Sequence, residues 1–257
     1  MNDWLEAAKE IAVAAGDMVK EMAASRPKVT HKGPVDLVTE ADVRAEKYII
    51  GELLRRFPGH QILAEESGGT ADAEYVWIID PIDGTTNYAH GFPVWAVSIG
   101  LFIDKRPAVG VVYDPNLGEL FAAVKGSGAV LNDKPISVST VGKMTDGLLA
   151  TGFPYTLREG PQRIMSDFSQ IYLACQGVRR AGAATIDLCA VACGRFDGFW
   201  EVGLKPWDTA AAGLIVEEAG GRLSKYSGGS FDHFVPEMVA SNGLIHQELL
   251  DILQRQD

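Results

Sequence analysis

Apolar residues recur along the first part of the chain with the spacing of helices. Between residues 3 and 24 they fall three or four positions apart, at Trp4, Ala8, Ile11, Ala15, Met18 and Met22, and this period predicts an amphipathic helix. A second helix is expected from near Glu40 towards Arg56. Pro58 and Gly59 follow it and end it, because neither residue readily continues a helix.

From residue 61 the pattern changes to short apolar runs, which predict strands. Asp104-Lys105-Arg106 joins two of these runs as a hairpin signal, and Gly126-Ser127-Gly128 separates two others. Strands are expected at about residues 61–64, 75–79, 94–103, 107–113, 118–124 and 129–131. The first half, about residues 1–145, is therefore predicted to place helices over a largely antiparallel sheet.

The second half, about residues 146–257, alternates between strand and helix patterns. Strands are expected near residues 147–151, 177–179, 197–201 and 237–240, and helices near 161–174, 183–193, 207–219 and from 243 onward. No linker-like or low-complexity segment separates the halves, so residues 1–257 are predicted to form a single domain. These patterns alone indicate an α/β or α+β fold without choosing between them.

Composition narrows the classes of function. The net charge is −11 and no long basic run is present, which argues against direct nucleic-acid binding. No apolar run reaches the roughly 20 residues that cross a bilayer, so a membrane protein is not expected. Asp3, Glu6 and Glu10 occupy positions where a secretory signal would be apolar. A cytoplasmic protein is therefore expected.

The segment from Asp80 to Asn87, DPIDGTTN, carries the strongest chemical signal. It follows the apolar run at 75–79, so a buried strand is expected to deliver Asp80 and Asp83 at its C-terminal end. Gly84 allows a tight turn directly after them. Carboxylate oxygens beside free amides suit Mg²⁺ and a phosphate group. Taken alone, the two acids also fit an acidic turn or a helix cap.

Three further segments accompany DPIDGTTN in a fixed order. They are Lys32 to Asp42 (KGPVDLVTEAD), Leu63 to Ser67 (LAEES) and Trp207 to Gly221 (WDTAAAGLIVEEAGG). Together the four segments resemble the inositol monophosphatase family of metal-dependent phosphatases, and the resemblance spans residues 32 to 221. It implies a layered αβαβα sandwich and the hydrolysis of a small sugar or polyol phosphate.

The resemblance also implies a site for two Mg²⁺ ions. The implied ligands are Glu65, Asp80 and the Ile82 carbonyl for one ion, and Asp80, Asp83 and Asp208 for the other. Glu65 would share a weaker third ion. One carboxylate shared between two cations holds them about 4 Å apart, the usual spacing of two-metal sites. Glu66 follows Glu65 directly, and successive strand residues point to opposite faces, so only one of them should enter the site.

Asp42, Thr85 and Glu65 form the implied catalytic group. Asp42 and Thr85 would position the attacking water and help to deprotonate it, because a threonine hydroxyl can relay a proton when a carboxylate accepts it. Asp42 alone also fits an early-helix acid that favours the helix dipole. The amides of Gly84, Thr85 and Thr86 are expected to bind phosphate oxygens at a helix N-terminus. Attack would be direct and in line, with no phosphoenzyme.

Substrate contacts are implied at two further places. Gly182, Ala183 and Ala184 open a predicted helix where many relatives have a Gly-Ser-Ala or Gly-Thr-Ala segment, so Ala183 removes one hydroxyl contact. Glu201 lies seven residues before Asp208, where inositol-specific relatives have an acid that accepts hydrogen bonds from ring hydroxyls. Glu201 also fits a surface acid at a strand end.

The expected activity is Mg²⁺-dependent hydrolysis of myo-inositol monophosphate by a metal-activated water. Alternatives within the superfamily are a fructose-1,6-bisphosphatase, a histidinol-phosphatase and a 3′-phosphoadenosine phosphatase. An alternative of another class is a regulatory protein that retains the fold and acts through partners, although the complete set of implied acids argues against a degenerate scaffold. Because the family usually forms homodimers and is often inhibited by Li⁺, both properties are expected here.

Overall fold

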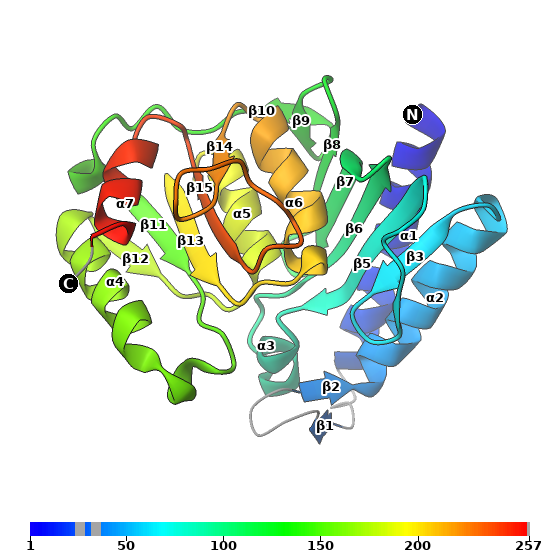
Figure 1. Ribbon diagram of the computed structural model, residues 1–257. Coiled ribbons are helices and arrows are strands. Elements are labelled where there is room, and N and C mark those ends of the chain that lie inside the picture. Colours follow the sequence, from blue (N-terminus) through cyan, green and yellow to red (C-terminus); the bar gives the residue numbers. More distant parts are fainter. Residues whose placement is uncertain (24–28, 32–36, 256–257) are drawn as a thin grey trace.

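The helices and strands are stacked in five layers (Figure 1). A computed structural model describes residues 1–23, 29–31 and 37–255. The layers are a helix pair, an eight-stranded sheet, a second helix pair, a five-stranded sheet and a third helix pair. This arrangement confirms the αβαβα sandwich implied by the resemblance. None of the helices in the described ranges has the length and apolar character needed to cross a membrane.

The bounds of the elements follow in chain order. They are α1 (Asn2–Ala23), β1 (Val29–His31), β2 (Leu37–Thr39), α2 (Glu40–Arg56), β3 (Gln61–Ala64), β4 (Gly68–Gly69), β5 (Tyr75–Asp83), α3 (Thr85–His90), β6 (Ala96–Ile103), β7 (Arg106–Asp114), β8 (Glu119–Val124), β9 (Ala129–Leu131), β10 (Lys134–Ile136), β11 (Leu148–Thr151), α4 (Pro161–Ala174), β12 (Gly177–Arg179), α5 (Ala184–Ala192), β13 (Gly198–Val202), α6 (Pro206–Glu218), β14 (Arg222–Ser224), β15 (Glu237–Ser241) and α7 (His246–Leu253).

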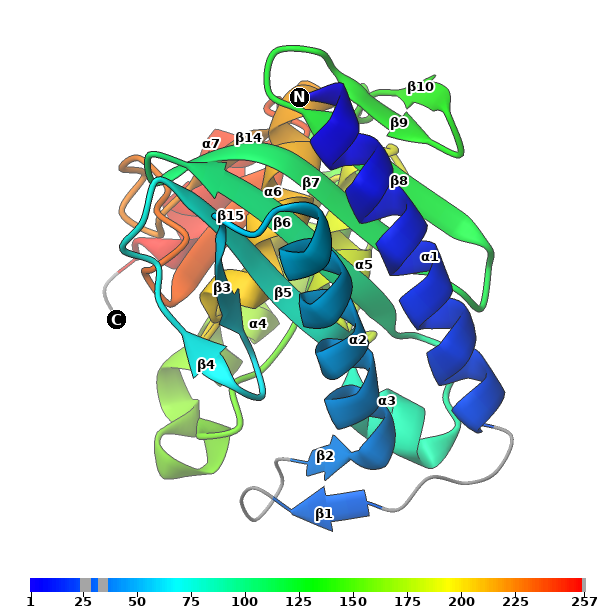
Figure 2. The same cartoon turned by 90° about the vertical axis from the view of Figure 1, so that its right-hand side faces the viewer.

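The larger sheet has the strand order β10-β9-β8-β7-β6-β5-β3-β4. Its neighbouring strands are antiparallel except for β3 and β5, which are parallel. Helices α1 and α2 cover one face of this sheet (Figure 2). Ile11 of α1 and Leu53 of α2 are buried there in one cluster with Trp77 and Ile99 of the sheet. Burial of this apolar surface holds the two helices in place.

The smaller sheet has the order β12-β11-β13-β15-β14, with parallel pairing from β12 to β13 and antiparallel pairing beyond it. Helices α4 and α7 cover its outer face. Helices α5 and α6 lie between the two sheets, where Leu188 and Leu214 share a cluster with Val112 of the larger sheet and Phe199 of the smaller. Because this cluster joins both halves, we propose that they form one domain.

The structure contains the helices and strands that the sequence predicts, with one informative difference. Strand β5 does not end at Ile79 but continues to Asp83, with a shift in its pairing with β6 between Asp80 and Asp83. The strands that the sequence analysis did not predict are short, since β1, β2, β4, β10 and β14 have two or three residues each. Helix α3, which was expected only as a helix N-terminus at Gly84 to Thr86, has six residues. Such segments are too short to show an apolar period.

Helix α6 packs unusually close to the larger sheet, because glycines of β6 and β7 lie under its alanines. A Cβ atom added at Gly110 would lie 2.5 Å from the Ala211 carbonyl oxygen and 3.0 Å from its Cα. One added at Gly100 would lie 3.0 Å from the Ala210 Cβ. This close approach brings the first turn of α6, which carries Asp208, next to β5.

Substitution Gly110→Ala is expected to destabilise the protein by about 1–3 kcal/mol, because overpacking against a helix backbone cannot be relieved by rotating a side chain. The free energy of unfolding from urea denaturation measures the effect. Gly51→Ala is the matched control, because Gly51 lies in α2 with nothing within 4 Å of an added Cβ. It should leave stability unchanged or raise it by up to about 1 kcal/mol. Equal stabilities of the two variants would contradict the close packing of α6.

Candidate active site

Carboxylates from three separate parts of the chain converge at the C-terminal end of β5. Asp80 and Asp83 belong to β5 and are only 2% and 8% exposed. Glu65 directly follows β3, the parallel neighbour of β5, and its amide donates to the Ile79 carbonyl (3.2 Å). Asp208 lies in the first turn of α6. The charges of Glu65, Asp83 and Asp208 all act on Asp80, so the structure brings together the four acids implied as metal ligands.

Three of these acids are fixed by one carboxylate oxygen to a backbone amide. The pairs are Asp80 Oδ1 with the Ile82 amide (2.9 Å), Asp83 Oδ2 with the Thr185 amide (2.7 Å) and Asp208 Oδ2 with the Lys205 amide (2.7 Å). The Thr185 hydroxyl also donates to Asp83 Oδ2 (2.5 Å). Each bond orients its carboxylate and satisfies one oxygen, while the second oxygen remains to face the other acids.

The cluster holds its protons unusually tightly. Burial raises the pKa of Asp80 well above its usual range, and the charges of Glu65 and Asp83 raise it further. Burial raises the pKa of Asp83 to about 6, although the hydrogen bonds from Thr185 oppose the rise. Burial and the charge of Asp83 likewise raise the pKa of Asp208. Burial and the mutual repulsion of these carboxylates therefore disfavour their ionised forms, which a bound cation would stabilise.

The donor set fits a hard divalent cation, because Mg²⁺ prefers carboxylate and carbonyl oxygens. Asp187 adds a further buried acid, whose Oδ1 atom has no hydrogen-bond partner among the described residues. Burial and the charge of Asp83 raise the pKa of Asp187. In the described part of the chain, no three Asp, Glu, His or Cys side chains are grouped closely enough to hold an ion.

Asp42 and Thr85 meet beside this cluster. Asp42 is fully buried, and its Oδ2 atom accepts hydrogen bonds from the Thr39 amide (2.8 Å) and hydroxyl (2.5 Å), completing a capping box at the start of α2. Its Oδ1 atom lies 3.0 Å from the Thr85 hydroxyl. That hydroxyl also lies 2.9 Å from the Ile82 carbonyl oxygen. Asp42 thus caps the helix and accepts a hydrogen bond from Thr85, so the two interpretations of the sequence are compatible.

The turn after β5 presents backbone amides next to the acids. Gly84 adopts the left-handed conformation (φ 95°), and an added Cβ would lie 2.9 Å from the Val94 carbonyl oxygen and 3.2 Å from the Ala183 Cβ. Helix α3 begins at Thr85, and Thr86 is exposed at its first turn. The first amides of a helix lack intrahelical acceptors. Gly84, Thr85 and Thr86 are therefore placed where the sequence predicts phosphate contacts.

The residues expected to contact substrate approach the same centre from the smaller sheet. Gly182, Ala183 and Ala184 lead into α5, and the Asn87 side chain of α3 donates to the Ala181 carbonyl (2.9 Å) beside them. Ala183 is almost fully buried.

Glu201 of β13 lies against Gly152, where an added Cβ would fall 2.1 Å from its Oε2 atom. Burial and the nearby charges of Asp208 and Asp187 raise the pKa of Glu201, so this side chain belongs to the acidic centre.

Sequence reasoning missed two residues of the centre. Glu46 is 4% exposed, and its carboxylate accepts hydrogen bonds from the amides of Glu66 (2.8 Å) and Ser67 (2.9 Å). It therefore holds the turn that carries Glu65. Its position four residues after Asp42, on the same helix face, was an available signal. Thr185 gave no such signal, because only the fold brings α5 to the end of β5.

One expected segment lies partly outside the described residues. The motif from Lys32 to Asp42 includes residues 32–36, which the structure does not describe. Leu37 to Thr39 form β2, which pairs with β1 in a short antiparallel ribbon near α3 (Figure 1).

Comparisons with known proteins agree with this site. The whole chain, residues 1–257, matches the inositol monophosphatase family. An inositol-1-monophosphatase of Synechocystis is 48% identical over 98% of this chain and 89% of its own. The Nus factor SuhB of Salmonella typhimurium is 40% identical over 97% of this chain and 95% of its own. The solved inositol monophosphatase of Anabaena superposes with a TM-score of 0.90 at 42% identity, covering 98% and 95% of the two chains. With the acids, the adjacent threonine and the layered fold in agreement, the chain belongs to the inositol monophosphatase family.

Proposed function

We propose that the protein is a Mg²⁺-dependent phosphomonoesterase that hydrolyses myo-inositol monophosphate to myo-inositol and phosphate. The observation that carries the proposal is the convergence of Glu65, Asp80, Asp83 and Asp208 in a buried site with raised carboxyl pKa values. A divalent cation relieves this repulsion, and a phosphate ester supplies further oxygen ligands for it.

The same acids are the proposed ligands of two Mg²⁺ ions, with the Ile82 carbonyl completing the first site and Glu65 sharing a weaker third ion. Bound Mg²⁺ would acidify the attacking water and stabilise the leaving oxygen of the ester. The protein's own part is to fix the ligands, since backbone amides hold one oxygen each of Asp80, Asp83 and Asp208.

Proton transfer is assigned to Asp42 and Thr85. The Thr85 hydroxyl accepts a proton from the attacking water as it passes its own to Asp42 Oδ1, 3.0 Å away. The Gly84, Thr85 and Thr86 amides bind the phosphate oxygens, and they neutralise charge that develops on them. Because the water attacks phosphorus directly, the scheme forms no covalent bond between protein and phosphate.

Substrate preference is assigned to the side of the site formed by α5 and β13. The Glu201 carboxylate is an acceptor suited to ring hydroxyls. Ala183 supplies no hydroxyl, which makes Glu201 and the backbone around Ala184 the main polyol contacts. A sugar bisphosphate or a nucleotide would instead need extra cationic groups for a second phosphate.

A second role through partners is favoured by one observation, the 40% identity to a relative named as a Nus factor. The retained acids make it an addition to catalysis rather than a replacement. A homodimeric state, inhibition by Li⁺ and a cytoplasmic location are further parts of the proposal.

The first test is phosphate release from inositol-1-phosphate, fructose-1,6-bisphosphate, histidinol phosphate and 3′-phosphoadenosine-5′-phosphate, with and without Mg²⁺. We expect Mg²⁺-dependent release that is fastest from inositol-1-phosphate and is reduced by millimolar LiCl. A different preferred substrate would overturn the assignment of Glu201. Absence of release from all four would overturn the phosphatase proposal.

Substitution Asp83→Asn is expected to nearly abolish turnover while stabilising the metal-free protein. The folded state holds the Asp83 proton with a pKa of about 6 against an ordinary value of 3.8. The folded protein therefore binds this proton more tightly than the unfolded chain does, and ionisation of Asp83 favours unfolding. The stability that the protonated carboxyl contributes is fully present below about pH 4 and is lost as pH rises through 6.

Melting midpoints measured in EDTA should accordingly be higher for Asp83→Asn than for the unsubstituted protein at pH 7.5, and similar at pH 4. Adding Mg²⁺ at pH 7.5 should raise the midpoint of the unsubstituted protein more than that of the variant. An equal Mg²⁺ response would refute Asp83 as a ligand.

Substitution Glu46→Gln is expected to weaken Mg²⁺ binding by roughly 10–100-fold, the range typical of residues that orient a metal ligand. A glutamine oxygen can accept only one of the two amides now bound by the carboxylate at 2.8 and 2.9 Å. The Mg²⁺ concentration that gives half-maximal activity should rise, with kcat at saturating Mg²⁺ largely retained. The control is Glu52→Gln in the same helix, whose half-buried carboxylate pairs with Arg55 instead of with backbone amides. A loss of kcat without a shift in Mg²⁺ dependence would contradict the positioning role.

A further inference from the structure

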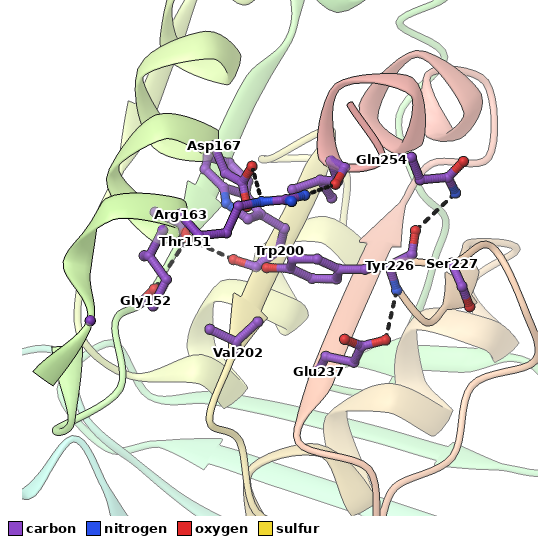
Figure 3. Close-up of a pocket in the computed structure, with 13 residues that line it drawn as sticks. Thr151, Gly152, Arg163, Asp167, Trp200, Val202, Tyr226, Ser227, Glu237 and Gln254 are labelled. Atoms are coloured by element: carbon purple, nitrogen blue, oxygen red, sulfur yellow. Dashed lines mark hydrogen bonds and ion pairs between the residues drawn. The ribbon is translucent and has the colours of Figure 1, made fainter. Parts of the chain in front are cut away.

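A second cavity, of about 790 Å³, opens on the smaller sheet (Figure 3). Its volume falls within the roughly 300–1,000 Å³ of small-molecule sites. Trp200 and Val202 of β13 line it. Glu201, the residue between them, points to the other face of the strand because successive side chains alternate. The cavity and the acidic centre therefore lie on opposite faces of one strand.

The charges that line the cavity disfavour an anion. Among the described residues that line it, Arg163 is the one cationic side chain, and it is already engaged. Its Nε atom lies 2.9 and 3.0 Å from the Asp167 carboxylate oxygens, and Nη2 donates to the Leu253 carbonyl. Glu237 adds a second carboxylate to the lining. With one paired cation and two acids, the wall carries a net negative charge, which repels phosphates and carboxylates.

The tyrosine that crosses the cavity is held rigidly. The Tyr226 amide donates to Glu237 Oε1 (3.2 Å), and the Gln254 side chain donates to the Tyr226 carbonyl (2.9 Å). Figure 3 shows its ring extending across the cavity towards β11 and α4. Burial raises the pKa of its hydroxyl, and the nearby charges of Asp167 and Glu201 raise it further. Ser227 lines the same wall with a second hydroxyl.

These groups select a class of ligand. Carboxylate oxygens and hydroxyls can accept or share hydrogen bonds, so the wall suits a neutral molecule with many hydroxyl donors. The ring of Tyr226 offers an apolar surface for the C–H groups of such a molecule. A preformed wall costs little entropy on binding.

The cavity is also in contact with the strand that carries Glu201. The Thr151 hydroxyl, on the cavity wall, donates to the Trp200 carbonyl (2.6 Å). Gly152, its neighbour on the same wall, lies directly against the Glu201 carboxylate. A molecule bound in the cavity would therefore contact Trp200 and Val202, the residues on either side of Glu201.

We propose that this cavity is a second binding site, which takes an uncharged polyhydroxylated molecule of sugar or cyclitol size beside the strand that carries Glu201. The site is separate from the acidic centre, so the proposal does not depend on the proposed catalytic function.

The test is a titration of the ¹⁵N-labelled, metal-free full-length protein with myo-inositol, glucose, inorganic phosphate and putrescine, followed by amide chemical shifts. We expect saturable shifts at Tyr226, Ser227 and Glu237 with the two polyols. Phosphate should leave these amides unshifted, and putrescine tests whether the negatively charged wall takes a cation instead of a polyol. Because the readout is binding without Mg²⁺, an inactive phosphatase would not affect the result.

Two variants identify the site. Tyr226→Phe should weaken polyol binding by about 2–10-fold, the value of one neutral hydrogen bond, and Ser227→Trp should abolish it by filling the opening. Tyr48→Phe, on α2 and remote from the cavity, should leave the cavity shifts unchanged. The proposal is overturned if polyol shifts are confined to residues 182–185, if no saturable shift occurs, or if phosphate or putrescine alone shifts the cavity amides.

Discussion

Negative charge buried at the end of β5 is the constraint on which the rest of the structure depends. Like charges in a medium of low dielectric repel strongly, so such a group of acids persists only in a rigid framework. Backbone amides supply that framework, because each of Asp80, Asp83 and Asp208 accepts a hydrogen bond from one of them. The buried acids thus lower the stability of the folded state, and a bound cation would offset this cost. Functional sites commonly reduce stability in this way.

The layers of the fold bring the acids, and the residues that orient them, to one edge of the larger sheet. Strands β3 and β5 are parallel and end at the same edge, so Glu65 lies beside the acids of β5. Glycines at positions 100 and 110 let α6 pack close to the sheet, which brings the turn carrying Asp208 to that edge. Helix α5 lies between the two sheets and places Thr185 where it donates hydrogen bonds to Asp83. Packing in the middle layer is therefore as important to the site as the motif residues themselves.

Much of this architecture was predictable from sequence, for reasons that differ between residues. Helix α2 and strand β5 have long apolar patterns, and the DPIDGTTN segment carries a recognisable chemistry, so Asp80 and Asp83 could be assigned directly. The family resemblance supplied Glu65 and Asp208, which lie far away in sequence. Thr185 could not be predicted, because its role depends on an interaction across 102 residues that local pattern does not encode. The cavity beside Tyr226 has the same origin, since its walls come from six separate segments of the chain.

Helix α2 contributes to two places at once, through Asp42 beside Thr85 and through Glu46 beneath the turn of Glu65. An α-helix advances about 100° per residue, so Asp42 and Glu46, four residues apart, lie on one face, and one residue more or less between them would change their relative direction by about 100°. Inserting or deleting one residue between Asp42 and Glu46 would turn one of the two carboxylates away from its hydrogen-bond partner. This would hold even if the apolar face of the helix were kept intact. The site therefore requires the four-residue spacing between Asp42 and Glu46. This requirement is set by the geometry of the helix backbone and not by the identity of the side chains between them.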